Sequence, residues 1–130
     1  MKIIDMKIVV VGNPWKNWIF VKIFTDEGIE GLGECTGGLM TAPNEGSLKE
    51  LKSRIIGRDP TRVNELIDFV RKTLFLSRGG NALSGIEMAC WDIIGKTCGR
   101  PLYQLLGGKV REKIRAYANG WYQGPREPRS

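Results

Sequence analysis

The chain has 130 residues, 42% of them hydrophobic and 26% charged, which is typical of a single globular domain. It contains no histidine, which excludes a histidine general base and any histidine metal ligand within the chain. The net charge is +6, but residues 109–130, with six basic and two acidic residues, carry +4 of it, and residues 1–108 only +2. Because most of the excess lies in the tail, we expect no nucleic-acid partner.

The membrane and secretory classes are also disfavoured. No apolar run approaches the roughly 18 residues that a membrane span requires, and the start lacks a basic-then-apolar signal pattern. The cysteines, Cys35, Cys90 and Cys98, are odd in number and lack metal-site spacing. We therefore expect buried thiols in a cytoplasmic protein without a membrane partner.

The first elements in chain order are strands. Residues 2–11, 18–24 and 29–35 are rich in β-branched and aromatic residues, and the turn 25–28 joins the second to the third. These segments predict a three-stranded antiparallel meander, with loops at 12–17 and 36–41. Gly31 and Gly33 resemble part of a phosphate loop, but they lie inside a strand, which indicates close backbone packing instead, and Glu34 is assigned a structural role.

Helices are expected next. One runs from Pro43 or Asn44 to about Ile56 and is capped by Gly57. Asp59 as N-cap, with Pro60 at the first helical position, predicts the start of a second. Its apolar face consists of Val63, Leu66, Ile67, Val70 and Leu74.

The segment 81–99 predicts the most buried helix. Ser84 and Glu87 form a capping-box pattern, although the helix could begin at Asn81. Three small residues on this helix would let a neighbouring backbone approach: Gly85, Ala89 and Gly95. The apolar face follows helical spacing and consists of Leu83, Ile86, Cys90, Ile93, Ile94 and Thr97.

After a short apolar turn at 102–106, residues 113–119 predict one more strand that has no partner in the first sheet. No closing element follows, which suggests a chain that continues beyond Ser130. A genuine stop at that point stays open. We expect a domain at 1–108 and a linker with the start of a second domain at 109–130.

The sequence of residues 84–96, SGIEMACWDIIGK, followed by GRPLYQLLGG at 99–108, resembles the amino-terminal capping domain of the mandelate racemase/muconate lactonizing enzyme branch of the enolase superfamily. The resemblance implies an α+β fold: the meander, a helical bundle and then the first strand of a truncated (β/α) barrel. NPWKNW at 13–18, followed by FVK at 20–22, is most like the galactonate- and gluconate-type acid-sugar dehydratases of this branch.

The resemblance also implies the chemistry. In this family, Mg²⁺ ligands and the catalytic base lie on later barrel strands, where a proton next to a carboxylate is abstracted. We therefore expect no catalytic residue and no metal ligand in this chain, which should be inert alone. The implied partners are the chain's own C-terminal barrel, an acid-sugar substrate and, in the full-length enzyme, further copies in a homo-oligomer.

Two cap loops of the family fold over the barrel mouth and shape substrate choice. By position these are 12–17 and 36–41, and the end of the first barrel strand also faces the active site. The substrate-contacting candidates are Trp15, Lys16, Asn17, Met40, Asn119 and Trp121. A solvated Lys16 and a core-packed Trp15 are the plainer alternatives. For the chain as a whole, the alternatives are a non-catalytic interaction module with the same fold, or a racemase or cycloisomerase of the superfamily.

Overall fold

A three-stranded antiparallel sheet, in the order β1-β2-β3, opens the chain: β1 (Ile3–Asn13), β2 (Lys16–Thr25) and β3 (Glu30–Glu34). The computed structural model describes residues 1–13, 16–38, 40–73 and 80–117. Neighbouring strands pair antiparallel, with Ile8 opposite Val21 and Val21 opposite Gly33. The predicted meander is confirmed.

Alternation along β2 decides which face of the sheet is covered. Ile19, Val21 and Ile23 are fully buried, whereas Trp18 and Phe20, on the other face, remain partly exposed. Side chains of a strand point to opposite faces in turn, so one apolar set can reach the core. This alternation places one face of β2 in the core and leaves the other partly exposed.

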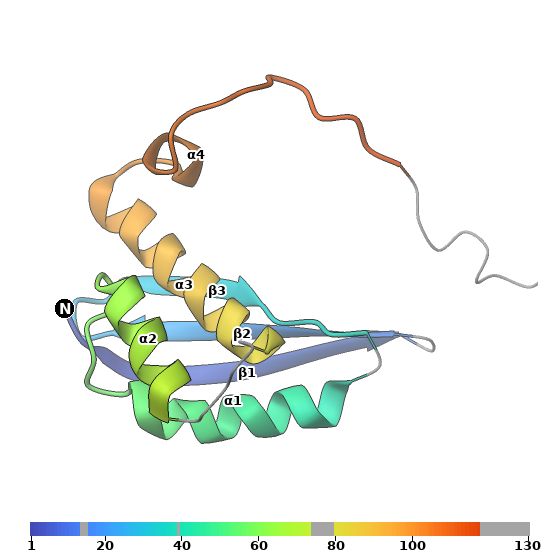
Figure 1. The fold of residues 1–130 in the computed structure, drawn as a ribbon, viewed down its shortest axis with the longest axis vertical. Helices are drawn as coiled ribbons and strands as arrows, with labels where there is room; N and C mark the ends of the chain where they lie inside the picture. Colours follow the sequence, from blue (N-terminus) through green and yellow to red (C-terminus); the bar gives the residue numbers. More distant parts are fainter. Residues whose placement is uncertain (14–15, 39, 74–79, 118–130) are drawn as a thin grey trace, which may run out of the picture.

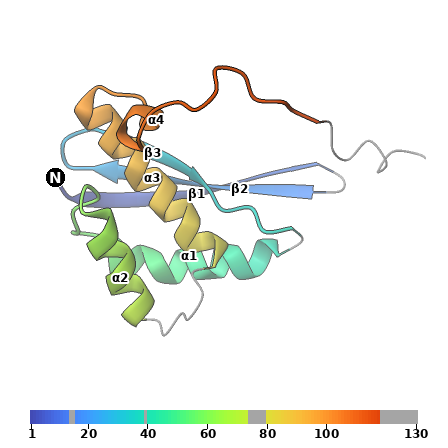
Figure 2. The ribbon, with the colours of Figure 1, turned by 45° about the horizontal axis from the view of Figure 1, so that its top comes forward.

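Three helices lie on the side of that buried face: α1 (Thr41–Ile55), α2 (Val63–Thr73) and α3 (Asn81–Cys98). The short α4 (Leu102–Leu105) follows the end of α3 and has no buried residue. In the two views α3 crosses the sheet diagonally, beside α1 and α2 (Figure 1, Figure 2). Buried residues from β1, β2 and the first three helices, together with Cys35 just after β3, form one core, which includes Met6, Leu51, Leu66 and Ile86. The predicted α+β fold is confirmed. Within the described ranges, none of these helices combines the length and apolar character that crossing a membrane demands.

The contact between β3 and α3 is made by backbone. A Cβ added at Gly31 would lie 2.0 Å from the carbonyl oxygen of Ala89, and one at Gly33 would lie 1.9 Å from that of Gly85. Real Cβ atoms do not approach so closely, so both positions require glycine. The predicted close packing is confirmed, and the neighbour is a helix backbone exposed by small residues.

Two predicted capping signals do not mark helix starts, although the alternative start of the third helix at Asn81 is confirmed. The helix α3 begins at Asn81 with Gly80 as its N-cap and no side-chain cap, so the capping box at Ser84 is wrong. The first turn is already closed there, because the amide of Ser84 donates to the carbonyl of Gly80. The helix α2 begins at Val63, because the Asp59 carboxylate accepts a hydrogen bond of 2.9 Å from the amide of Thr61 in a separate turn.

The predicted strand at 113–119 does not form within its described part, 113–117. Ile114 and Tyr117 are 86% and 85% exposed. A strand requires a partner for its backbone donors and acceptors, and no strand of the described sheet lies beside this tail.

Gly95→Leu should destabilise the domain more than Lys96→Leu. A Cβ at Gly95 would lie 3.1 Å from the carbonyl oxygen of Arg100 and 3.4 Å from Leu102, so a larger side chain would displace the end of the helix. Overpacking costs about 1–3 kcal/mol. Lys96 is exposed and makes two surface contacts: it pairs with Asp92 at 2.7 Å and donates to the carbonyl of Glu30 at 2.6 Å. The helix-surface ion pair is worth about 0.2–0.5 kcal/mol. Equal urea midpoints for the two variants would contradict the packing at Gly95.

Candidate functional site

Two chain segments meet at one end of the sheet, where β1 ends and β2 begins (Figure 1). Gly12 pairs with Asn17 and Asn13 with Lys16, so the strand ladder continues into the predicted loop 12–17. That loop is therefore shorter than expected, because its flanking residues pair with each other as a hairpin. The second segment, from Cys35 to Met40, connects β3 to α1 at the same end.

The structure brings together two of the predicted substrate-contacting segments. Asn17 Nδ2 donates a hydrogen bond of 3.1 Å to Thr41 Oγ1, which joins the start of β2 to the start of α1. Met40 is 57% exposed beside this contact in sequence. Lys16 lies with its Nζ 5.3 Å from the centroid of the Trp18 ring, a cation–π distance. Three of the predicted residues lie outside the described residues: Trp15, Asn119 and Trp121.

Further polar contacts hold the segment after β3. The amide of Ile19 donates to Thr36 Oγ1 at 3.1 Å, and the amide of Cys35 donates to the carbonyl of Ile19 at 2.8 Å. Asn44, a buried polar residue, donates from Nδ2 to the carbonyl of Cys35 at 3.4 Å. Sequence reasoning missed Thr36, Thr41 and Asn44. The available signal was a hydroxyl residue at each end of a glycine-containing loop.

An open hollow of about 270 Å³ lies next to this segment. It is lined by Glu34, Cys35, Thr36, Asn81, Ser84 and Met88. These side chains offer a carboxylate, hydroxyls and a carboxamide, which suits contact with a polar ligand. Burial raises the pKa of the Cys35 thiol to about 11, so this thiol stays protonated and is no activated nucleophile at neutral pH.

Thiol reactivity tests this burial. Cys35 and Cys90 are buried and Cys98 is exposed, so the expectation of three buried thiols is wrong for Cys98. Burial raises the pKa of Cys90 to about 12. We expect a thiol-specific reagent at pH 8 to modify one cysteine quickly in the native chain and three in denaturant. Cys98→Ser should abolish the fast phase. A second fast thiol in the native chain would contradict the burial.

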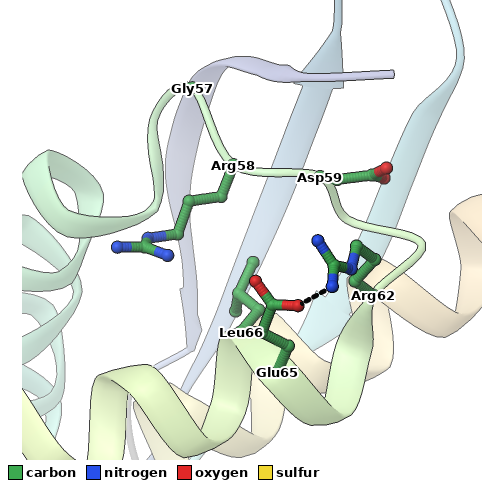
Figure 3. Close-up of a pocket in the computed structure, with 6 residues that line it drawn as sticks. All are labelled: Gly57, Arg58, Asp59, Arg62, Glu65 and Leu66. Atoms are coloured by element: carbon green, nitrogen blue, oxygen red, sulfur yellow. Dashed lines mark ion pairs between the residues drawn. The ribbon is translucent and has the colours of Figure 1, made fainter.

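A second hollow, of about 200 Å³, lies at the opposite end of β1 (Figure 3). Its basic groups already have partners: Arg62 pairs with Glu65, and Arg58 stacks 3.2 Å from the centroid of Phe69. The eleven residues of β1 separate it from the Asn17–Thr41 contact by roughly 30 Å, at about 3.3 Å per residue. This hollow therefore belongs to a different region of the domain.

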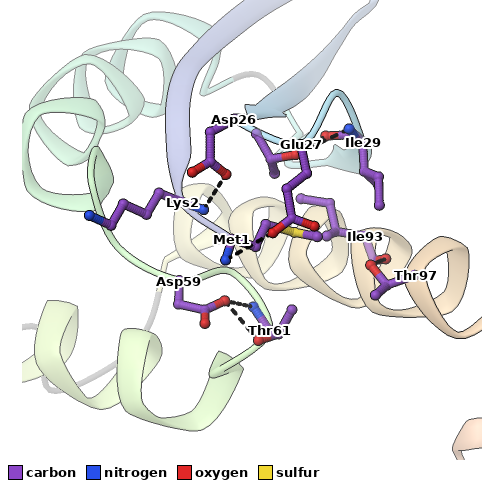
Figure 4. Close-up of polar contacts among 10 residues, drawn as sticks. Met1, Lys2, Asp26, Glu27, Ile29, Asp59, Thr61, Ile93 and Thr97 are labelled. Carbon is purple, nitrogen blue, oxygen red and sulfur yellow. Dashed lines mark hydrogen bonds and ion pairs between the residues drawn. The ribbon is translucent and has the colours of Figure 1, made fainter.

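The polar contacts beside that second hollow have a structural role (Figure 4). The amide of Lys2 donates to Asp26 Oδ1 at 2.7 Å, and the amino group of Met1 lies 3.1 Å from Glu27 Oε1. These contacts tie the start of β1 to the turn between β2 and β3. Burial alone would raise the pKa of the Asp59 carboxyl, but the hydrogen bonds from Thr61 lower it below its ordinary value.

The described residues do not fit a magnesium site. No group of three or more cysteine, aspartate or glutamate side chains is placed to hold a metal ion in the part of the chain that the structure describes. Magnesium prefers carboxylate oxygens gathered in an octahedral arrangement. The described side chains therefore do not by themselves provide the ligands of a magnesium site.

The three-stranded antiparallel sheet followed by helices is the fold of an enolase-superfamily amino-terminal domain. The model of the mandelate racemase/muconate lactonizing enzyme N-terminal domain matches residues 4–107, and the chain belongs to this family.

Curated relatives are acid-sugar dehydratases. The chain is 45% identical over 113 residues to a D-galactonate dehydratase of Pectobacterium atrosepticum, covering 84% of this chain and 29% of the relative. It is 38% identical over 119 residues to a D-gluconate dehydratase of Thermoproteus tenax, covering 88% and 24%. The chain thus spans less than a third of the length of either relative.

A solved structure shares the fold and carries ligands. An enolase from Pantoea ananatis, with bound D-gluconate and Mg, superposes with a TM-score of 0.77 at 37% identity, covering 84% of this chain and 28% of that one. The predicted family is confirmed. The two curated relatives are more than three times as long as the part that matches this chain, so each carries a large further region.

Proposed function

We propose that this chain is the substrate-capping domain of a magnesium-dependent acid-sugar dehydratase. The observation that carries the proposal is the similarity over 84% and 88% of the chain to dehydratases of D-galactonate and D-gluconate. The reaction is proton abstraction next to the substrate carboxylate, followed by loss of water. When bound in the barrel, magnesium supplies charge stabilisation for the developing enediolate.

The residues of this chain contribute enclosure. The Asn17–Thr41 contact joins the β1–β2 hairpin to the start of α1, directly after the 35–40 segment, at one end of the sheet. Both segments can cover a barrel mouth from there. Covering a site excludes water and strengthens the polar contacts inside it. Lys16, Asn17 and Met40 are the described candidates for contact with the substrate.

The finer organisation follows from the same proposal. Residues 1–108 form the cap, and residues 109–130 lead into a C-terminal barrel that holds the metal ligands and the base. The exposed apolar side chains of the tail, Val110, Ile114 and Tyr117, support this, because a barrel would cover them. We propose a homo-oligomer for the full-length enzyme and a cytoplasmic location, which the free thiols support.

A domain exchange tests the proposal. Residues 1–108 would replace the matching cap of the P. atrosepticum dehydratase, with the barrel without any cap as the control. We expect magnesium-dependent dehydration of an aldonate by the chimera and no turnover by the 130-residue chain alone. A folded chimera, verified by circular dichroism, that binds magnesium yet dehydrates no aldonate or aldarate would contradict the proposal. So would dehydration by the chain alone.

A further inference from the structure

We infer that Gly12, Asn17 and Thr41 form a link that holds the two segments at the end of the sheet in one fixed arrangement. In this inference Asn17 and Thr41 are positioning residues, which set where their neighbours lie. The link itself rests on geometry alone. Its consequence for catalysis rests on the proposed function.

The position of the link in the sequence carries the first part of the argument. The hydrogen bond of 3.1 Å is donated by Asn17, itself one of the three described candidates, and it lies one residue from the other two, because Asn17 directly follows Lys16 and Thr41 directly follows Met40. Asn17 and Thr41 are both half-buried, so water competes only in part for their donor and acceptor. A contact at this place sets the separation of Lys16 and Met40.

Gly12 supplies the space that the link needs. A Cβ at Gly12 would lie 2.3 Å from Asn17 Oδ1, because the two residues are opposite each other in the β1–β2 ladder. The clashing atom is the end of a side chain that can rotate away. An alanine at this position would therefore displace the carboxamide from Thr41 while the strand pairing persists.

The other polar contacts of this region do not join the hairpin to α1. Thr36 binds the amide of Ile19, and Asn44 binds the carbonyl of Cys35, so both hold the segment that follows β3. The Asn17–Thr41 hydrogen bond joins the hairpin end to the first residue of α1. Its loss should loosen the start of α1 relative to the hairpin and leave the core intact.

Amide hydrogen exchange of the 130-residue chain tests the link. The reporters are the amides of Met40, bonded to the carbonyl of Gly37, and Asn44, bonded to the carbonyl of Met40. Asn17→Ala, which changes only β2, should speed exchange at both reporters by about 2- to 10-fold, the range expected for one net hydrogen bond. Gly12→Ala should do the same, although it keeps both partners.

A double-mutant cycle separates coupling from general loosening. Combined with Asn17→Ala, Thr41→Val should add no further acceleration, and Thr41→Ser, which keeps the hydroxyl, should retain slow exchange. The matched control is Ser47→Ala, which removes a hydroxyl bond of 2.9 Å to the Pro43 carbonyl within α1. Unchanged reporters in Asn17→Ala and Gly12→Ala, or additive effects in the cycle, would overturn the link.

Kinetics of the chimera test the catalytic consequence. Thr41→Val should raise KM for the acid sugar by about 2- to 10-fold with kcat changed by less than about 2-fold, and Thr41→Ser should restore KM. If kcat falls by as much as KM rises, and Thr41→Ser does not restore either value, the positioning role is overturned. If exchange behaves as expected but the chimera dehydrates no acid sugar, the proposed function fails and the link stands.

Discussion

Gly33→Ala should lower the free energy of unfolding by about 3 kcal/mol or more. The added Cβ would lie 1.9 Å from the carbonyl oxygen of Gly85, which belongs to the backbone of α3 and cannot rotate away. Overpacking usually costs about 1–3 kcal/mol where side chains can adjust, and more where they cannot. Here the strand and the helix must separate. Urea denaturation followed by circular dichroism measures the loss.

Gly46→Ala is the matched control for Gly33→Ala. Gly46 lies inside α1, and nothing is within 4 Å of the position that its Cβ would occupy. Removing a helix-interior glycine should raise the free energy of unfolding by about 0.5–1 kcal/mol. Glycine-to-alanine substitution should therefore lower the free energy of unfolding at Gly33 and raise it at Gly46. A Gly33→Ala midpoint equal to or above that of the unaltered chain would refute the backbone contact between β3 and α3.

Ile86→Ala should lower the free energy of unfolding by about 2–5 kcal/mol. Ile86 is fully buried in α3, within the core that joins the sheet to the helices. Removing its side chain loses transfer free energy and leaves a cavity that the packed neighbours fill only in part. Thermal and urea denaturation should both report the change.

Met88→Ala, two residues further along the same helix, is the control for Ile86→Ala. Met88 is 42% exposed, so its truncation should change the free energy of unfolding by about 0.5 kcal/mol or less. Both variants carry an alanine at an α3 position, so helix propensity does not explain a difference between them. Similar losses for the two variants would mean that the buried face of α3 is misassigned.

Much of the fold could be predicted, because local patterns and tertiary packing agree in it. The alternation in β2 and the helical spacing of Leu83, Ile86, Cys90 and Ile93 identify the buried faces correctly. Thr97 was placed on the same face but is exposed, and its hydroxyl donates to the carbonyl of Ile93 at 2.8 Å. Helical spacing predicts on which face of the helix a residue lies. It does not predict how far along the helix the packing against the sheet and the other helices extends.

Helix starts were harder to predict, because the same residue types cap helices and close turns. Asp59 carries a typical capping signal, yet its carboxylate binds Thr61 Oγ1 at 2.7 Å in a turn before α2. Gly80 at the start of α3 has no side chain and therefore gives no capping signal. Whether a capping residue sits at the helix start depends on how the preceding turn packs.

The two loops of the candidate site were predicted from the sequence, but the contact between them was not predicted. Asn17 and Thr41 are separated by 23 residues, and their pairing depends on how the segment after β3 returns beside the hairpin. Gly12 was predicted only as the first residue of the loop 12–17, whereas its lack of a Cβ makes room for Asn17. Neither role follows from residue type or spacing without the register of β1 against β2.

The paired approach of β3 and α3 also limits how this sequence can change by mutation. Every missense change in a glycine codon adds a Cβ, so no missense change at Gly31 or Gly33 yields a residue that fits against Ala89 or Gly85. A tolerated change would require the helix to shift first, through substitutions elsewhere. These two codons should therefore accept only synonymous variation in a library of single mutants, while the codon of Gly46 accepts many replacements.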